Sequence, residues 1–362
     1  MNFLSSALPS APAPIMFTTA ELPHRQRLEA WNAHFQSVNT VQVSEPEASD
    51  LLVLNENWML GAMLYSANAT GRVRFERGPR HVRLDGHDHW VVRVLRRGRN
   101  RVTIGDSTWS MQAGEALLFS LDSGWVSEWA DAEWASVCLP RDAFPDISAG
   151  FAALGPGPLK VPGATLLADF FNLLEHHLRT ATPDHLPMLA ETTRALVASS
   201  LLSDIAPGSV TPADRSAAQL ERVRGLTRQH LASPSLNAHR LARMAGMSRS
   251  ALYRLLEPHG GVATYIQALR LKLAHALLSD PSLANVPIAT VAERAGFFDA
   301  SAFSRAFRSG FGYPPREARA AGLVGRHVPG VAPGSAPRIV DEDFGALLRR
   351  LAVTAPLRAA TA

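Results

Sequence analysis

The sequence predicts an α+β chain, in which an antiparallel β-barrel and two helices precede an all-α domain of two helix-turn-helix units. Three observations lead to this prediction. Short alternating segments separated by turn residues fill residues 51–139, and helical periodicity takes over after Gly163. A helix–glycine–helix pattern then occurs twice, about 50 residues apart. A length of 362 residues corresponds to about two domains.

Composition and charge limit the classes of function. No apolar run reaches the roughly 18 residues of a membrane span, and a single cysteine cannot form an internal disulfide, so we expect a cytoplasmic protein with no membrane partner. The net charge of +4 divides into −6 over residues 1–215, +8 over 216–320 and +2 over 321–362. The basic block is the candidate for binding a polyanion.

The N-terminal part is expected to contain a short leader and then strands. Residues 1–17 have no Lys or Arg and are interrupted by prolines, which predicts a disordered leader over 1–19 and argues against a signal peptide. The strand signals follow with no helix between them, which indicates an antiparallel sandwich or barrel. They lie at 71–77, 90–95, 101–104, 108–111, 116–119, 124–129 and 134–139. Residues 96–100 are expected to turn. Six tryptophans in this part are expected to build its core: Trp58, Trp90, Trp109, Trp125, Trp129 and Trp134.

Two helices are expected after Gly163. The first has an apolar face of Leu166, Leu167, Phe170, Phe171, Leu174 and Leu178, and the second one of Leu189, Leu196, Val197 and Leu201. They can pack on the barrel or pair with a second subunit.

The composition also sets the domain boundaries. We expect a sensor domain over 20–205, a linker over 206–215, a helical domain over 216–320 and a flexible tail over 321–362, with a short helix possible at 344–351.

The repeated pattern in the basic block is that of a helix-turn-helix. Ala precedes Gly at Gly246 and again at Gly296, and the next helix starts at an N-cap residue, Ser248 or Asp299. Glycine ends the first helix in a left-handed conformation, and the second helix presents a polar face. The alternative is two helical hairpins whose polar faces only contact solvent. Two copies of the same pattern with matching spacing, both inside the basic block, favour DNA binding. The exposed face is expected to consist of Arg249, Ser250, Tyr253, Arg254, Ala300, Ser301, Ser304 and Arg305.

A helix over residues 264–278 is expected to connect the two units. Fifteen residues span about 22 Å. Such a helix can hold two recognition helices in successive major grooves, which lie about 34 Å apart.

This basic segment resembles the DNA-binding domain of the AraC/XylS family of bacterial transcription regulators. The resemblance covers residues 216–320, and its most specific part is Gly296-Phe297, Phe303-Ser304-Arg305, Phe307, Phe311-Gly312 and Pro315. The family's DNA-contacting positions carry over to the eight residues of the exposed face. This chain departs from the family at Ala318, where Tyr is usual, at Pro258, late in the first recognition helix, and at Ala300, which is too small to read a base by hydrogen bonds.

The resemblance also extends, more weakly, to residues 20–205. It implies a cupin-like antiparallel barrel that binds a small effector, followed by two dimerisation helices. It further implies a homodimer, a double-stranded DNA operator and RNA polymerase as partners.

Three features of the sensor bear on a metal site, an effector pocket and a reactive cysteine. His87-Asp88-His89 lacks the following acidic ligand and later His of a cupin metal site, so a turn or pocket wall is the better interpretation. The ten arginines between Arg72 and Arg101 could line a pocket for a carboxylate effector, but the alternation at residues 72–75 favours a solvated strand face. Cys138 is expected to be a buried strand residue.

The sequence therefore predicts a sequence-specific transcription regulator, expected to be an activator, with a small-molecule effector in the barrel. No catalytic residue, metal or cofactor is expected, and the effector-binding residues are not specified. Three alternatives stay open. They are a ligand-independent dimeric regulator, a cupin-type metalloenzyme fused to a DNA-binding domain, and a DNA-repair alkyl acceptor that uses the single cysteine.

Overall fold

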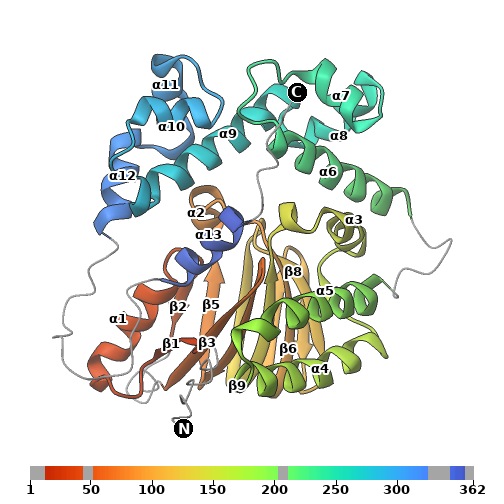
Figure 1. Cartoon of the computed structure of the whole chain (residues 1–362), viewed down its shortest axis with the longest axis vertical. Helices are drawn as coiled ribbons and strands as arrows, with labels where there is room; N and C mark the ends of the chain where they lie inside the picture. The colour runs from red at the N-terminus through yellow and green to blue at the C-terminus, as the bar shows by residue number, and fades with distance from the viewer. Residues whose placement is uncertain (1–12, 44–51, 203–210, 325–342, 355–362) are drawn as a thin grey trace, which may run out of the picture.

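The computed structural model describes residues 13–43, 52–202, 211–324 and 343–354. Figure 1 shows a β-rich sensor domain with a layer of helices beside it and a separate helical domain above it. No helix in these ranges has the length and apolar character needed to cross a membrane. The predicted fold class, a β-domain followed by a helical domain, is confirmed.

The sensor contains one sheet of ten strands in which every pairing is antiparallel. The main path runs β1-β3-β4-β9-β6-β8-β10, while β5 joins β2 to β9 and β7 pairs with β6. The strands are β1 (Ile15–Thr18), β2 (Thr40–Gln42), β3 (Val53–Leu60), β4 (Met63–Thr70), β5 (Val73–Arg77), β6 (Trp90–Ile104), β7 (Ser107–Met111), β8 (Ala116–Ser120), β9 (Trp125–Leu139) and β10 (Gly157–Pro158).

Two strands of fifteen residues, β6 and β9, form the spine of the sheet. The sequence predicted each as two short strands, and the expected turn at residues 96–100 was wrong. The chain continues through this region with register shifts between Leu95 and Arg99. Gly98 has a φ of +81°, and a Cβ there would lie 2.3 Å from the carbonyl oxygen of Asp131. Glycine thus allows a bulge where the sequence pattern indicates a turn.

Helices cover the outer face of this sheet. They are α3 (Pro145–Leu154), α4 (Gly163–Leu178) and α5 (Leu186–Leu202). Their buried residues, such as Phe151, Phe171 and Val197, share a core with outward residues of the sheet. Leu166, predicted to be on the packed face of α4, is instead 49% exposed.

A second core fills the inside of the sheet. The helix α1 (His24–Phe35) contributes Trp31, and α2 (Pro79–Leu84) follows β5 near the top of the domain (Figure 1). Of the six predicted core tryptophans, Trp109 is only partly buried, while the other five are buried.

Both ends of the sensor core differ from the sequence prediction. Residues 15–18, assigned to a disordered leader, form β1 and pair with β3, whereas residues 1–12 lie outside the described ranges. The short helix expected as an option at 344–351 forms as α13 (Phe344–Thr354), but it packs on the sensor and is not part of a flexible tail. Its Leu347, Leu348 and Leu351 are fully buried in the inner core of the sensor. Each segment carries apolar residues that only distant strands can cover.

Over the described residues 211–324, seven α-helices make the helical domain. They are α6 (Pro212–Gln229), α7 (Ala238–Ala245), α8 (Arg249–Leu256), α9 (Val262–Ser279), α10 (Ile288–Arg294), α11 (Ala300–Phe311) and α12 (Pro315–Val324). The first of them, α6, begins four residues before the predicted domain start at 216, because Thr211 accepts a hydrogen bond from the Asp214 N–H and caps it. One small core lies among α6, α7, α8 and the first half of α9, and another lies among the second half of α9, α10, α11 and α12.

Candidate nucleic-acid interface

The first helix-turn-helix unit consists of α7 and α8. Gly246 ends α7 with a φ of +67°, and the N–H of Met247 donates to the carbonyl of Ala242 at 3.0 Å. The Ser248 side chain accepts from the N–H of Ala251 and starts α8. This is the C-cap and N-cap chemistry that the sequence predicted.

The second unit, α10 and α11, repeats this geometry. Gly296 has a φ of +87°, and the N–H of Phe297 donates to the carbonyl of Ala292 at 2.8 Å. The Asp299 carboxylate accepts from the N–H groups of Ser301 and Ala302 and starts α11. The hydrogen bonds at the turn and at the start of the second helix thus recur in both units, as the sequence repeat predicts.

All eight predicted DNA-contacting side chains lie on the exposed faces of the two second helices. They are Arg249, Ser250, Tyr253 and Arg254 on α8, and Ala300, Ser301, Ser304 and Arg305 on α11. The opposite faces carry Leu252, Leu256, Phe303 and Phe307, which are buried. Pro258 lies after α8 in a short 3₁₀ turn, and Ala318 is buried against the second core. Neither departure from the family pattern interrupts a recognition helix.

The two units are held in a fixed relation by α9 and by Arg270. The helix α9 lies between them (Figure 1), and its 18 residues span about 27 Å. The Arg270 guanidinium donates to the carbonyls of Leu231 and Ser233, both at 3.0 Å, and so ties α9 to the loop after α6. A Cβ on Gly296 would lie 2.1 Å from the Leu231 oxygen. Glycine at this turn therefore permits close contact between the units.

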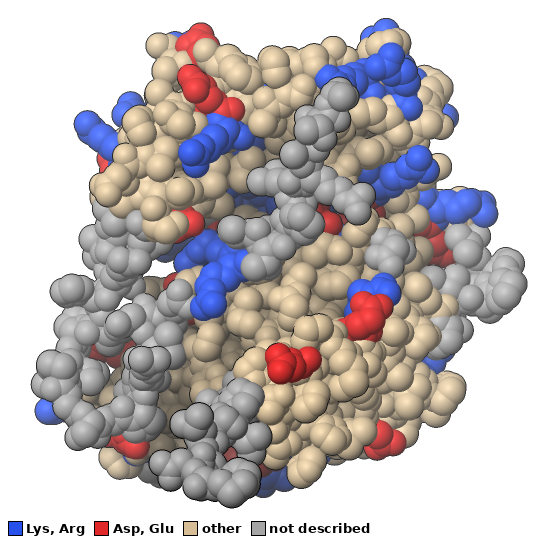
Figure 2. All heavy atoms as spheres, in the orientation of Figure 1, with Lys and Arg blue, Asp and Glu red and all other residues tan. Residues whose placement is uncertain are grey.

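Basic side chains in the view of Figure 2 gather on the helical domain and along its boundary with the sensor, while the lower part of the sensor shows few. This agrees with the +8 charge of residues 216–320. A basic domain with two exposed helix faces is suited to the phosphates and major groove of duplex DNA.

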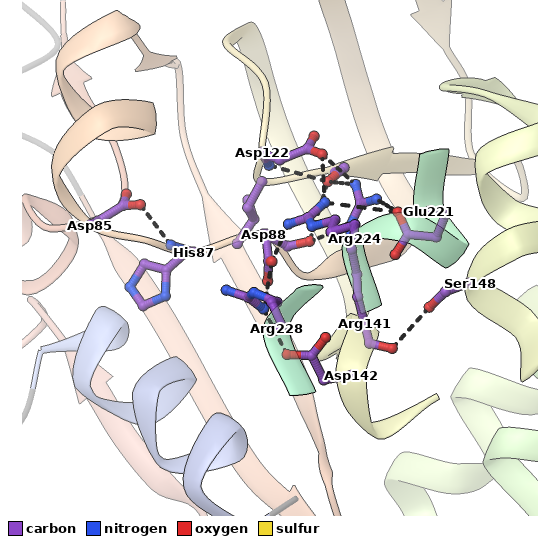
Figure 3. Close-up of polar contacts among 12 residues, drawn as sticks. Asp85, His87, Asp88, Asp122, Arg141, Asp142, Ser148, Glu221, Arg224 and Arg228 are labelled. Atoms are coloured by element: carbon purple, nitrogen blue, oxygen red, sulfur yellow. Dashed lines mark hydrogen bonds and ion pairs between the residues drawn. The ribbon is translucent and has the colours of Figure 1, made fainter. Parts of the chain in front are cut away.

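Not all of the basic residues are available to a nucleic acid, because α6 is bound to the sensor through a buried ion cluster (Figure 3). Arg224 contacts the Asp88 carboxylate, and Arg228 reaches the same group at 2.7 Å. From the sensor side, Arg141 contacts the Glu221 carboxylate of α6. The cluster is completed by Asp122, 3.1 Å from Arg224, and by Asp142, 2.8 Å from Arg228.

The cluster stabilises the charged forms of Asp88 and Arg224, whereas burial raises the pKa of Glu221 and Asp142 and lowers that of Arg141. Although burial disfavours a charged carboxylate, Arg224 and Arg228 hold the pKa of Asp88 well below its usual range. Burial disfavours charge on Arg224 as well, but Asp88 and Glu221 raise its pKa above the ordinary value. No sequence pattern predicted this junction, because its partners on α6 and on the sensor are at least 80 residues apart. The only signal was an acidic residue between two histidines.

The His87-Asp88-His89 segment is thus a structural part of the domain junction. All three residues are buried. Burial lowers the pKa of His89 to about 4, so its imidazole is neutral at pH 7. Among the described residues, no group of three His, Cys, Asp or Glu side chains is placed to hold a metal ion.

The other sensor features have separate environments. Arg74 pairs with Glu128 at 3.0 Å on an open strand face, as predicted for this alternation, whereas Arg93 points into the barrel. Cys138 is buried, as predicted, and burial raises the pKa of its thiol to about 12. A thiol with this pKa is not an activated nucleophile.

Comparisons with known proteins agree with this interface. Residues 241–321 match the family model described as a helix-turn-helix domain. The chain is 39% identical over 88 residues to the XylDLEGF operon transcriptional activator 3 of Pseudomonas putida, covering 23% of this chain and 26% of that protein. It is 36% identical over 107 residues to the transcriptional activator NphR of a Rhodococcus species, covering 28% and 31%. The matches therefore span about a quarter to a third of these relatives.

A solved structure extends the likeness to both domains. The AraC-like transcriptional activator CuxR aligns with a TM-score of 0.52 and 25% sequence identity over 73% of this chain and 96% of its own. The fold and the interface define a helix-turn-helix protein with a β-rich partner domain. Its C-terminal domain is an AraC-type helix-turn-helix domain, similar to those of XylS/AraC-family transcriptional activators.

Proposed function

We propose that the protein is a cytoplasmic, sequence-specific DNA-binding transcription activator, that it is controlled by a small molecule in the sensor barrel, and that it acts on RNA polymerase at its promoters. The pair of helix-turn-helix units carries this proposal, because all eight predicted contact residues are exposed on two helices joined by α9. The activator role is supported by relatives whose names describe transcriptional activators.

Site-selected DNA provides the test. In a mobility-shift titration on sequences selected by the protein, Arg254→Ala and Arg305→Ala should each weaken binding by about 1–3 kcal/mol, since each removes a candidate base contact. Arg97→Ala, which changes an exposed sensor residue paired with Glu133, is the control. Wild-type affinity in both recognition-helix variants would refute the interface.

The proposed effector site is a cavity inside the sensor, lined by α1, strands of the barrel and Phe344 of α13. This cavity favours a ligand-controlled regulator over a ligand-independent one. The cavity walls come mainly from aromatic and aliphatic side chains, the usual composition of a small-molecule site.

A homodimer is part of the proposal, and α4 supplies the surface for it. Leu166 and Leu173 are 49% and 54% exposed, and the half-buried Phe170 lies between them at helical spacing. A second copy can cover this stripe, since the same helix on the partner presents the same apolar row. Leu166→Asp with Leu173→Asp should shift the sedimentation coefficient toward that of a monomer, and an unchanged value would refute this surface.

A further inference from the structure

We propose that the sensor cavity binds a small arylalkyl carboxylate, that Arg93 holds its carboxylate, and that its ring takes the place of the Phe344 ring of α13. The inference deepens the proposed sensor role and rests on it. Three features carry it: an arginine that has no counter-ion among the described residues, an aromatic cavity and a wall supplied by α13.

The first feature is the environment of Arg93. It lies within the apolar run of β6, and its guanidinium carbon is 4.7 Å from the ring centre of Phe119 and 5.0 Å from that of Trp129. Nε and Nη1 are buried, and neither has a hydrogen-bond partner among the described residues. Burial lowers the pKa to about 10, so the group is still charged at neutral pH.

Two buried arginines of the sensor show what the half-buried Arg93 lacks. Arg77 contacts the Asp85 carboxylate at 2.5 Å, and Arg141 contacts Asp122 at 2.7 Å. The aromatic rings around Arg93 attract a cation, but they do not neutralise it. A buried charge without a counter-ion is costly, and an incoming carboxylate can supply two charge-assisted hydrogen bonds in the plane of the guanidinium.

The second feature is the shape and chemistry of the cavity. Arg93 shares its walls with Trp31, Phe75, Trp125 and Trp134. Aromatic and aliphatic walls select an apolar body, while the one cationic group selects an acidic end. The volume of the cavity is about 60 Å³. A dry cavity of about 150 Å³ accommodates benzene, so a ring needs more room than this cavity offers.

The third feature is the source of that room. Phe344 lines the cavity, and its ring centre lies 5.1 Å from that of Phe35. The strands around the cavity are fixed by continuous ladders, whereas Phe344 begins a helix of eleven residues with no strand partner. Phe344 can therefore leave the cavity at a lower cost than any strand residue. A ligand ring in its place restores the aromatic contacts.

The displacement has a defined neighbour. A Cβ on Gly345 would lie 3.1 Å from Nε2 of His87, so the first turn of α13 packs against the segment that carries Asp88. Asp88 contacts Arg224 and Arg228 of α6. A ligand that moves α13 thus acts directly beside the contact between the sensor and the DNA-binding domain.

Binding by the full chain tests the proposal. Titration calorimetry and tryptophan emission are recorded with phenylacetate, 3-phenylpropionate and 4-phenylbutyrate, and with the three matching amides. At least one acid should bind one-to-one and change the emission, because Trp31, Trp125 and Trp134 line the cavity. The amides should bind about 10- to 150-fold more weakly, as the charge-assisted contact is lost.

Variants separate the two parts of the proposal. Arg93→Met should lose binding of the acids by the same factor while its thermal midpoint stays equal or rises, because a buried charge is removed. Arg97→Met, on the outer face of the same strand, should bind as wild type. Phe344→Ala should bind about tenfold more tightly, because no ring has to be displaced.

Each opposite result overturns a stated part. Equal binding of acids and amides, wild-type binding by Arg93→Met, or a lower midpoint in that variant refutes the carboxylate assignment. Unchanged affinity in Phe344→Ala refutes the displacement, and no acid bound by either wild type or Phe344→Ala refutes the site. Mobility shifts on selected DNA keep the proposed function separate: DNA binding without acid binding rejects this inference alone, and acid binding without DNA binding rejects the regulator.

Discussion

Asp88→Asn tests whether the buried ion cluster joins the two domains into one cooperative unit. The variant keeps the size of the side chain and removes its charge. Asp88 accepts a hydrogen bond from Arg224 and forms an ion pair with Arg228 at 2.7 Å, and both arginines belong to α6. The change therefore falls on the contact between domains and leaves both domain cores intact.

The expected loss of free energy in Asp88→Asn depends on the carboxylates with which Arg224 and Arg228 stay paired. Removing one partner of a buried ion pair costs about 3–5 kcal/mol when the other charge is left alone. Here Arg224 keeps Asp122 at 3.1 Å and Arg228 keeps Asp142 at 2.8 Å. We therefore expect a loss of about 2–4 kcal/mol, which weakens the domain contact by about 30- to 700-fold.

The positions of the tryptophans provide the assay. All seven lie between residues 31 and 134, so their emission follows the sensor alone, whereas far-ultraviolet circular dichroism also follows the helical domain. In urea, the two signals should change together in the wild type and separately in Asp88→Asn. Asp106→Asn, an exposed turn residue, is the control and should behave as wild type. Coincident transitions at an unchanged midpoint in Asp88→Asn would refute the cluster as the source of the coupling.

Two further predictions concern buried groups and turns. Burial lowers the pKa of His34 and of His89 to about 4, so the unfolded chain takes up these protons first, and stability is complete above about pH 6.5 and falls between pH 6.5 and 4. The free energy of unfolding from urea titrations should therefore be lower at pH 5.0 than at pH 7.5, by up to about 2 kcal/mol for each histidine, and equal values would contradict this origin. Gly246→Ala and Gly296→Ala form a matched pair at the two turns: both have positive φ, but a Cβ meets nothing within 4 Å at Gly246 and meets a backbone oxygen at 2.1 Å at Gly296. The free energy of unfolding should therefore fall by about 1 kcal/mol in Gly246→Ala and by much more in Gly296→Ala, as followed by thermal unfolding. Equal losses in the two variants would show that the contact with Leu231 is unimportant.

The helical domain could be predicted well because its signals are local. A glycine C-cap, an N-cap residue and an apolar spacing act within one or two turns of helix. In the structure, Gly246 ends α7 and Ser248 caps α8, and their counterparts in the second unit have the same roles, as the sequence indicated. The exposure of Arg254 and Arg305 follows from the same periodicity. Which bases or phosphates they contact depends on the DNA, and no pattern within the chain contains that information.

The sensor was harder to predict because its defining contacts are distant in sequence. The alternation at residues 72–75 gave a correct solvated face at Arg74, but the same interpretation fails at Arg93. Both faces of β6 near Arg93 are covered, one by the inner core and one by the helices α3–α5. A lone arginine in the apolar run Trp90–Leu95 was the available signal. The docking of α13 depends on a barrel formed more than 200 residues earlier, and its apolar periodicity predicts a helix without predicting its place.

The division of charge between the domains has a physical meaning beyond DNA attraction. Part of the sensor's acidic excess, Asp88, Asp122 and Asp142, lies against α6 and satisfies Arg224 and Arg228. The positive charge left for a polyanion lies on exposed arginines of the helical domain, which include Arg249 and Arg254 on α8 and Arg305 and Arg308 on α11. Salt screens exposed charges far more than buried ones, so rising ionic strength should release DNA well before it separates the domains. Measuring DNA affinity and the coincidence of the two unfolding signals over the same salt range distinguishes the two kinds of contact: loss of both at the same salt concentration would show that the junction is held by solvent-exposed ion pairs.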